Sequence, residues 1–119
     1  MPEIPDEWCD YSKKIAREYR LEFNRRYPYL LESYGRGPYS EESFIMHIGR
    51  MLENQADELC NEGRIEEAIS LFEKALEIYV HDRSLAQNLY FKKKADRSLL
   101  DIPQTRIELV CAKIKRLEP

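Results

Sequence analysis

The sequence predicts an all-α fold of five or six helices that pack as antiparallel αα-hairpins. Apolar residues recur at steps of three or four along most of the chain, which is the period of an amphipathic helix. No stretch of useful length shows the apolar and polar alternation of a half-buried strand. The 119 residues are 43% hydrophobic and 34% charged with only 4 glycines, and that length and composition predict a single globular domain over residues 1–119.

The first predicted element is an aromatic helix over residues 6–34. Asp6 is placed to cap its start, and Glu7 suits the positive end of the helix dipole. Pro28 predicts a kink or a break near Tyr27, so the helix count is five if the first helix continues and six if it breaks. Its apolar face is Trp8, Tyr11, Ile15, Tyr19, Phe23, Tyr27, Leu30 and Tyr34.

A helical hairpin is predicted over residues 40–80. Ser40 is a good N-cap, and the apolar period continues to Leu59. Gly63 makes the turn because glycine adopts the left-handed conformation without steric cost. A second helix follows at once, and two helices joined by so short a turn must be antiparallel neighbours.

A C-terminal helix pair is predicted over residues 84–117. His81–Arg83 is interpreted as a break, after which Ser84 caps a helix that runs to about Leu99. Pro103 is well tolerated in a first helical turn, so Asp101 restarts the chain as the last helix.

The hairpin resembles one tetratricopeptide repeat (TPR) over about residues 49–80. In that family each repeat of about 34 residues pairs two helices, so the resemblance implies a TPR-like helical bundle that binds proteins or peptides. Ala56 and Ala68 are small where the helices cross, and the segment GRIEEAISLFEKALEI is close to the usual second helix of the family. The matching residues are Leu52, Ala56, Leu59, Gly63, Ile65, Ala68, Phe72, Ala75 and Ile78.

The resemblance also implies a ligand groove, because the first helix of each repeat lines the groove in that family. A charged stripe on a helix is otherwise a solvated face. If the groove binds a ligand, Glu53 and Asp57 favour a basic or amide-rich peptide. The implied groove residues are Arg50, Glu53, Asn54, Asp57 and Asn61.

A second resemblance covers residues 48–100. A TPR hairpin with one more helix is similar to the microtubule-interacting-and-transport (MIT) module, which binds short helical tails of membrane-remodelling polymers. Residues 83–97 would stand for its third helix, and the N-terminal 40 residues have no place in that module.

The charges divide the chain into an acidic middle and a basic end. Residues 41–82 carry three basic and 11 acidic residues, whereas residues 83–119 carry nine basic and four acidic residues. The basic end predicts either pairing with the acidic hairpin or an alternative function as a small nucleic-acid-associated regulator. The overall pI of about 5.5 argues against a general nucleic-acid binder. The strongest basic cluster is Lys92, Lys93, Lys94 and Arg97.

The aromatic N-terminal helix has two interpretations. Six of the eight tyrosines lie in residues 1–40, and their helical spacing favours packing within the chain. The alternative is self-association into a homodimer or larger homo-oligomer, because the apolar stripe is long for one helix to bury internally. Trp8 and Tyr11 are the candidate residues for that contact.

No catalytic or metal-binding motif is present. Cys9, Cys60 and Cys111 have no disulfide or zinc-ligand spacing and are predicted to be small core residues. His47 and His81 lie in separate elements with no local nucleophile pattern. The sequence therefore predicts a cytoplasmic, non-enzymatic protein-interaction adaptor or scaffold with no cofactor, no metal and no transmembrane segment.

Overall fold

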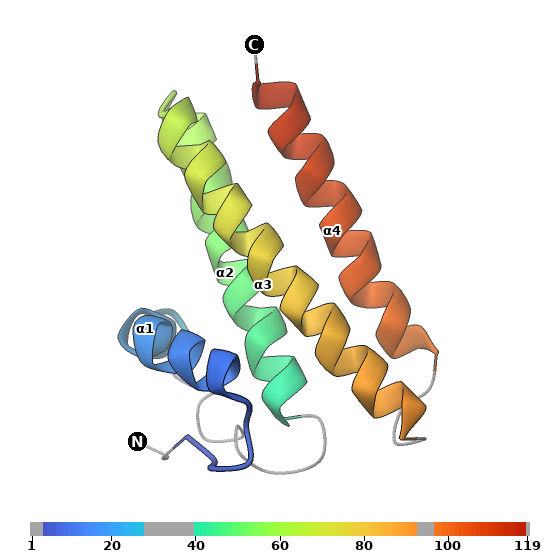
Figure 1. Ribbon diagram of the computed structural model, residues 1–119. Helices are drawn as coiled ribbons and strands as arrows, with labels where there is room; N and C mark the ends of the chain where they lie inside the picture. Colours follow the sequence, from blue (N-terminus) through green and yellow to red (C-terminus); the bar gives the residue numbers. More distant parts are fainter. Residues whose placement is uncertain (1–3, 28–39, 93–96, 119) are drawn as a thin grey trace.

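The computed structural model describes residues 4–27, 40–92 and 97–118, and these residues form four α-helices and no strand. The helices pack antiparallel in chain order, with the α2–α3 hairpin at the centre, α1 against α2, and α4 against the other side of α3 (Figure 1). The all-α class is confirmed. The helices are α1 (Asp10–Arg26), α2 (Ser40–Asn61), α3 (Ile65–Phe91) and α4 (Ser98–Leu117).

The prediction of five or six helices is wrong because α3 is one continuous helix of 27 residues. No Gly or Pro interrupts it, and its buried positions keep a helical period through Ile78, Tyr79, Asp82 and Ala86. The expected break at His81–Arg83 therefore lies within the helix. Polar residues alone do not end a helix whose apolar stripe continues on both sides of them.

The bounds of the first and last helices also differ from the predicted ones. Cys9, not Asp6, is the N-cap of α1, because residues 6 and 7 form a turn in which the Trp8 N–H donates to the Pro5 carbonyl at 3.3 Å. A kink or a break is predicted near Tyr27, and α1 ends at Arg26 with Tyr27 as its C-cap; residues 28–34 of the predicted helix lie outside the described residues. In α4 the helix begins at Ser98, so Pro103 lies inside it and not in the first turn.

The α2–α3 hairpin is confirmed, and two glycines shape it. Gly63 has φ +78°, the left-handed conformation that the turn requires. Gly49 lies where α2 and α3 approach closely, because a Cβ added there would meet the Tyr79 Cε1 atom at 2.6 Å. Tyr79 is fully buried, so its ring fills the space that the missing side chain leaves.

The core joins the hairpin to α1 through aromatic rings. Phe44 of α2 contacts both Trp8 and Phe23, with ring centroids 5.5 and 5.2 Å apart. Val110 is the fully buried apolar residue that α4 adds to this core cluster. The hairpin therefore supplies most of the core, and α1 and α4 cover it from two sides.

Candidate functional site

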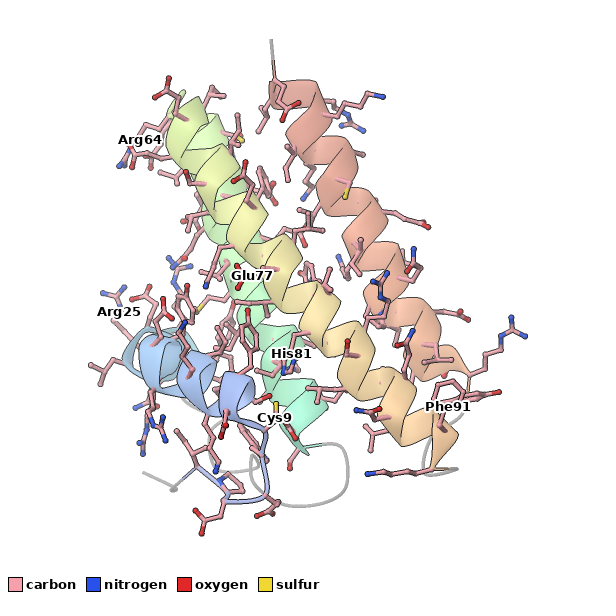
Figure 2. All side chains as sticks on the ribbon, viewed as in Figure 1. Cys9, Arg25, Arg64, Glu77, His81 and Phe91 are labelled. Atoms are coloured by element: carbon pink, nitrogen blue, oxygen red, sulfur yellow. The ribbon has the colours of Figure 1, made fainter. Side chains whose placement is uncertain are left out.

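Four polar side chains from three helices meet where the start of α1 lies against the hairpin (Figure 2). The Ser12 Oγ atom lies 2.8 Å from the His81 Nε2 atom and 3.2 Å from the Cys9 Sγ atom. The Cys9 Sγ atom lies 3.5 Å from the same Nε2 atom. The backbone N–H of Cys9 donates to the Glu41 Oε2 atom at 3.1 Å. These residues, Cys9, Ser12, Glu41 and His81, are named the Cys9–His81 cluster.

Local structure explains why these residues meet. Cys9 has extended backbone angles as the N-cap of α1, and Ser12 lies in the first turn of that helix. Glu41 lies in the first turn of α2, where a carboxylate suits the positive end of the helix dipole. His81 lies on α3 because that helix continues past the predicted break. Cys9, Glu41 and His81 each bring one ligand atom into a space where these atoms lie within 4.8 Å of one another.

Tyr11 fixes the His81 ring from one side. The two rings meet edge to face with centroids 4.5 Å apart, and the Tyr11 hydroxyl donates to the Glu77 Oε1 atom at 2.8 Å. Partial burial lowers the pKa of His81, although the charge of Glu41 opposes that shift. Burial and the Glu77 carboxylate raise the pKa of Tyr11. The imidazole is therefore neutral near pH 7 and held in one orientation.

An open cavity of about 310 Å³ adjoins this cluster. Cys9 and Glu41 form part of its wall, and Cys9 is exposed to solvent. The prediction that the cysteines are small core residues is wrong for Cys9 and Cys111, which are both exposed, and Cys60 is half-buried. The other residues around the cavity are Glu7, Glu42, Leu85, Asn88, Leu89 and Lys92.

Two buried acids, Glu42 and Asp82, directly follow Glu41 and His81 of the cluster in the sequence. Asp82 is fully buried and Glu42 is 3% exposed. Neither carboxylate oxygen of Asp82 has a hydrogen-bond partner among the described residues. Burial and the neighbouring Glu42 carboxylate raise the pKa of Asp82 to about 10. Burial beside a second carboxyl group therefore favours the protonated form of Asp82.

The predicted groove residues include the acceptors of an ion pair within the chain. Asn54 and Asn61 are exposed and Arg50 is half-buried. Glu53 is only 4% exposed, and it accepts from the Lys113 Nζ atom of α4 at 2.6 Å. The same ammonium group lies 3.1 Å from the Asp57 Oδ2 atom. The acidic hairpin and the basic end of the chain thus meet at Lys113.

Tyr79 adds a further hydrogen bond to this ion-pair network. The hydrogen bonds of the network shift the pKa values of Glu53 and Lys113. The Tyr79 hydroxyl donates to the Glu53 Oε1 atom at 2.8 Å. Burial acts to raise the pKa of Glu53, but the hydrogen bonds from Lys113 and Tyr79 outweigh it and lower that pKa below its usual value. Burial acts to lower the pKa of Lys113, but its hydrogen bonds to Glu53 and Asp57 outweigh burial and raise that pKa above its usual value. Both charges are therefore present near pH 7.

The residues predicted for the basic cluster and those predicted for self-association lie in different environments. Lys92 and Arg97 are exposed at the end of α3 and the start of α4, and Lys93 and Lys94 lie outside the described residues. Trp8 is 6% exposed against Phe44. Tyr11 is half-buried against His81. The two residues considered for self-association thus contact the chain's own helices.

Large apolar side chains are exposed at several positions. Phe91, at the end of α3, is 76% exposed, and its ring lies 5.8 Å from that of Tyr90 (Figure 2). Leu21, on α1, is 81% exposed. The remaining ones are Val80, Ile102 and Leu109.

The Cys9–His81 cluster was missed by sequence reasoning because its members are far apart in the chain. Cys9 and Glu41 are 32 residues apart, and Cys9 and His81 are 72 apart. The helical period offers a partial signal, since Ser12 precedes Ile15 by three residues on the buried face of α1. The sequence gives no such signal for His81, because residues 81–83 are interpreted there as a break between helices.

None of the helices in the described part of the chain combines the length and the apolar character that a membrane span requires. The comparisons with known proteins give no relative from which a role could be inferred: no protein-family model, curated protein or solved structure matches this chain.

Proposed function

We propose that this chain is a non-enzymatic, TPR-like module that binds a protein partner at the end of the bundle where α3 ends and α4 begins. The observation that carries this proposal is the exposure of Phe91. A phenylalanine side chain that is 76% exposed forgoes most of the roughly 1.5–3 kcal/mol that its burial would provide. Phe91 and Tyr90 together offer the kind of aromatic anchor that is enriched at protein interfaces.

Charge around Phe91 defines the class of partner. Lys92 follows it directly, and Arg97 lies at the start of α4, and both are exposed. Ile102, on the first turns of α4, is 46% exposed and adds apolar area at the same end. A partner segment with acidic and apolar side chains would complement both the positive charge and the apolar area of this surface.

Two features of the hairpin support the TPR-like interpretation. Ala56 and Ala68 are fully buried near the turn, and Gly63 is left-handed between them. Glu53 and Asp57, however, already bind Lys113. The face that would form a TPR groove is therefore occupied in part by the chain's own C-terminal helix, which favours the α3–α4 end as the partner surface.

The burial of Ser12 argues against a serine nucleophile at His81. The Ser12 hydroxyl contacts the His81 ring in the way that a catalytic nucleophile contacts its general base. Ser12 is, however, fully buried. A substrate would have to displace α1 to reach it.

Site-specific cross-linking tests the proposal. A photoreactive phenylalanine analogue at Phe91 is expected to capture one set of proteins from an extract of the native host, and the same analogue at Leu21 is the matched control. Leu21 is equally exposed but lies on α1. Lys92→Glu combined with Arg97→Glu should reduce capture at position 91 at least about tenfold, because an acidic partner loses its opposite charges.

Three outcomes would contradict the proposal. Equal capture at positions 91 and 21 would show a non-specific apolar surface. Cross-links to a second copy of the chain would show self-association instead. Binding to random DNA or RNA that weakens steeply with salt and is lost in the Lys92→Glu, Arg97→Glu variant would show the nucleic-acid function.

A further inference from the structure

The Cys9–His81 cluster brings together a thiol, an imidazole and a carboxylate, each from a different helix. Cys9 caps α1, Glu41 starts α2, and His81 lies in α3. These are the three protein groups that zinc takes as ligands. Exposed acids often lie together without binding a cation, but a thiol and an imidazole in contact with each other are a rarer combination.

The distances suit a tetrahedral ion. A sulfur bound at about 2.3 Å and a nitrogen bound at about 2.1 Å lie about 3.6 Å apart when the angle between them is tetrahedral. The observed separation of the Cys9 Sγ and His81 Nε2 atoms is 3.5 Å. The ligand atom of Glu41 lies within 4.8 Å of both. Glu41 is a long, half-buried side chain, so rotation about its own bonds is enough to bring an oxygen closer.

Neighbouring groups hold the ligands in place, as the outer shell of a metal site does. The backbone N–H of Cys9 donates to the Glu41 Oε2 atom, which keeps that carboxylate beside the thiol and the imidazole. The Tyr11 ring packs against the His81 ring, and the bond of Tyr11 to Glu77 anchors it. The contacts of Tyr11 orient His81 before any ion arrives, whereas the Glu41 side chain turns to reach the ion.

The cavity of about 310 Å³ gives an ion access to the cluster. It adjoins Cys9 and Glu41, so an ion bound by the three side chains would keep a fourth position for a water or for a ligand in that cavity. Ser12 lies within 3.2 Å of both the sulfur and the ring nitrogen, and its hydrogen bond to Nε2 would give way to the ion.

We propose that Cys9 Sγ, a carboxylate oxygen of Glu41 and His81 Nε2 bind one Zn²⁺ ion. The thiol loses its proton to solvent on binding, and the ion accepts one electron pair from each ligand. A thiolate with an imidazole selects Zn²⁺ over Mg²⁺ or Ca²⁺, which prefer oxygen ligands. The ion cross-links the start of α1 to both helices of the hairpin. That cross-link stabilises the docking of α1, whose contacts with the hairpin are fewer than those within it.

The test is zinc affinity of the full chain, kept reduced and measured by competition with a chromophoric chelator. Wild type is expected to bind one Zn²⁺, and Cys9→Ser and His81→Gln should each weaken binding about 100-fold or more, because loss of a ligand exceeds the effect of losing an outer-shell partner. Cys111→Ser and His47→Gln are the matched controls, since they remove the same groups elsewhere, and they should bind as wild type does. Mg²⁺ should not compete.

Two further readouts separate a site from a general loss of fold. Co²⁺ should give a thiolate charge-transfer absorption in wild type and in Cys111→Ser but not in Cys9→Ser. Zn²⁺ should raise the Tm of wild type and leave that of Cys9→Ser unchanged, with the circular dichroism of both apo proteins alike. The proposal is overturned if Cys9→Ser binds zinc as tightly as wild type, or if Cys111→Ser loses the ion instead.

Discussion

At the residue scale, the close approach of α2 and α3 at Gly49 depends on the absence of a side chain there. Gly49 faces the Tyr79 ring, and an added Cβ would lie 2.6 Å from one ring carbon and 2.8 Å from another. In an exposed helix the change from glycine to alanine would stabilise by about 1 kcal/mol. Here the steric clash acts in the opposite direction and is the larger effect.

Gly49→Ala is therefore expected to destabilise the fold by about 1–3 kcal/mol, because the buried ring cannot move aside without disturbing its neighbours. Urea unfolding measures the change. In a Tyr79→Leu background, which lacks the ring, the same substitution should cost less. Equal costs in the two backgrounds would show that Tyr79 does not limit the space at Gly49.

Asp82 is a residue whose burial opposes stability. Its two oxygen atoms are buried without hydrogen-bond partners among the described residues. Burying a polar group in that state costs about 1–3 kcal/mol by mutational measures. Its position follows from the period of α3, which places residue 82 on the same buried stripe as Ile78 and Ala86.

Asp82→Leu, of similar shape, is expected to raise the free energy of unfolding by about 1–3 kcal/mol, since it removes both unpartnered oxygens. Thermal or urea unfolding measures this gain. The control Glu73→Leu lies on the exposed face of the same helix and should change stability by less than about 0.5 kcal/mol. A loss of stability in Asp82→Leu would mean that the carboxyl has a favourable partner.

At the scale of the elements, a mixed polar contact joins α4 to both helices of the hairpin, in addition to the apolar packing of Val110. Lys113 bonds to Glu53 and Asp57 on α2, and its ammonium also lies 5.5 Å from the centre of the Phe72 ring on α3. Glu53 has 5% of its side chain exposed and Lys113 has 31%. The carboxylate of Glu53 is therefore shielded from water, whereas the ammonium group of Lys113 is partly hydrated. Removing the lysine would leave a buried carboxylate without its ion-pair partner.

Lys113→Met is expected to destabilise the fold by about 1–3 kcal/mol near pH 7. The lowered pKa of Glu53 means that this contribution is present above the unfolded-state pKa of about 4.5 and is lost as pH falls through the lower folded value. The raised pKa of Lys113 means that the contribution is also lost as pH rises through a value above 10.5.

Urea unfolding of wild type and Lys113→Met across pH measures the effect, and the two stability curves should converge in acid. Lys115→Met, exposed on the same helix, is the control and should follow wild type. A difference between wild type and Lys113→Met that stays constant down to pH 2 would show that the lysine acts through packing of its alkyl chain and not through its charge.

At the scale of the whole molecule, the helices form a thin layer. The principal extents are 42 × 32 × 23 Å, and the smallest is about the thickness of two helices. The radius of gyration of 14.7 Å exceeds the roughly 13.5 Å expected for a compact chain of this length. Such a shape leaves apolar side chains exposed on the outer helices, among them Leu21 of α1 and Leu109 of α4.

The local patterns of the sequence predicted the parts of the fold that depend on near neighbours. The hairpin turn at Gly63 and the antiparallel pairing of α2 with α3 follow from a helical period and a short connection, and both are observed. The predicted helix count is wrong because the three polar residues His81 to Arg83 do not outweigh the helical period on either side of them. Burial of the continuous stripe of α3 decided the outcome.

The sequence by itself determined that the chain is all-α, that residues 40–80 contain a hairpin, and that an acidic middle and a basic end are available to pair. Only the tertiary structure decided that Lys113 is the residue that joins them, that Asp82 is fully buried, and that Cys9 lies beside His81. The reason is physical: a helical period acts over three or four residues, whereas the contacts of a side chain with distant residues depend on how the helices cross.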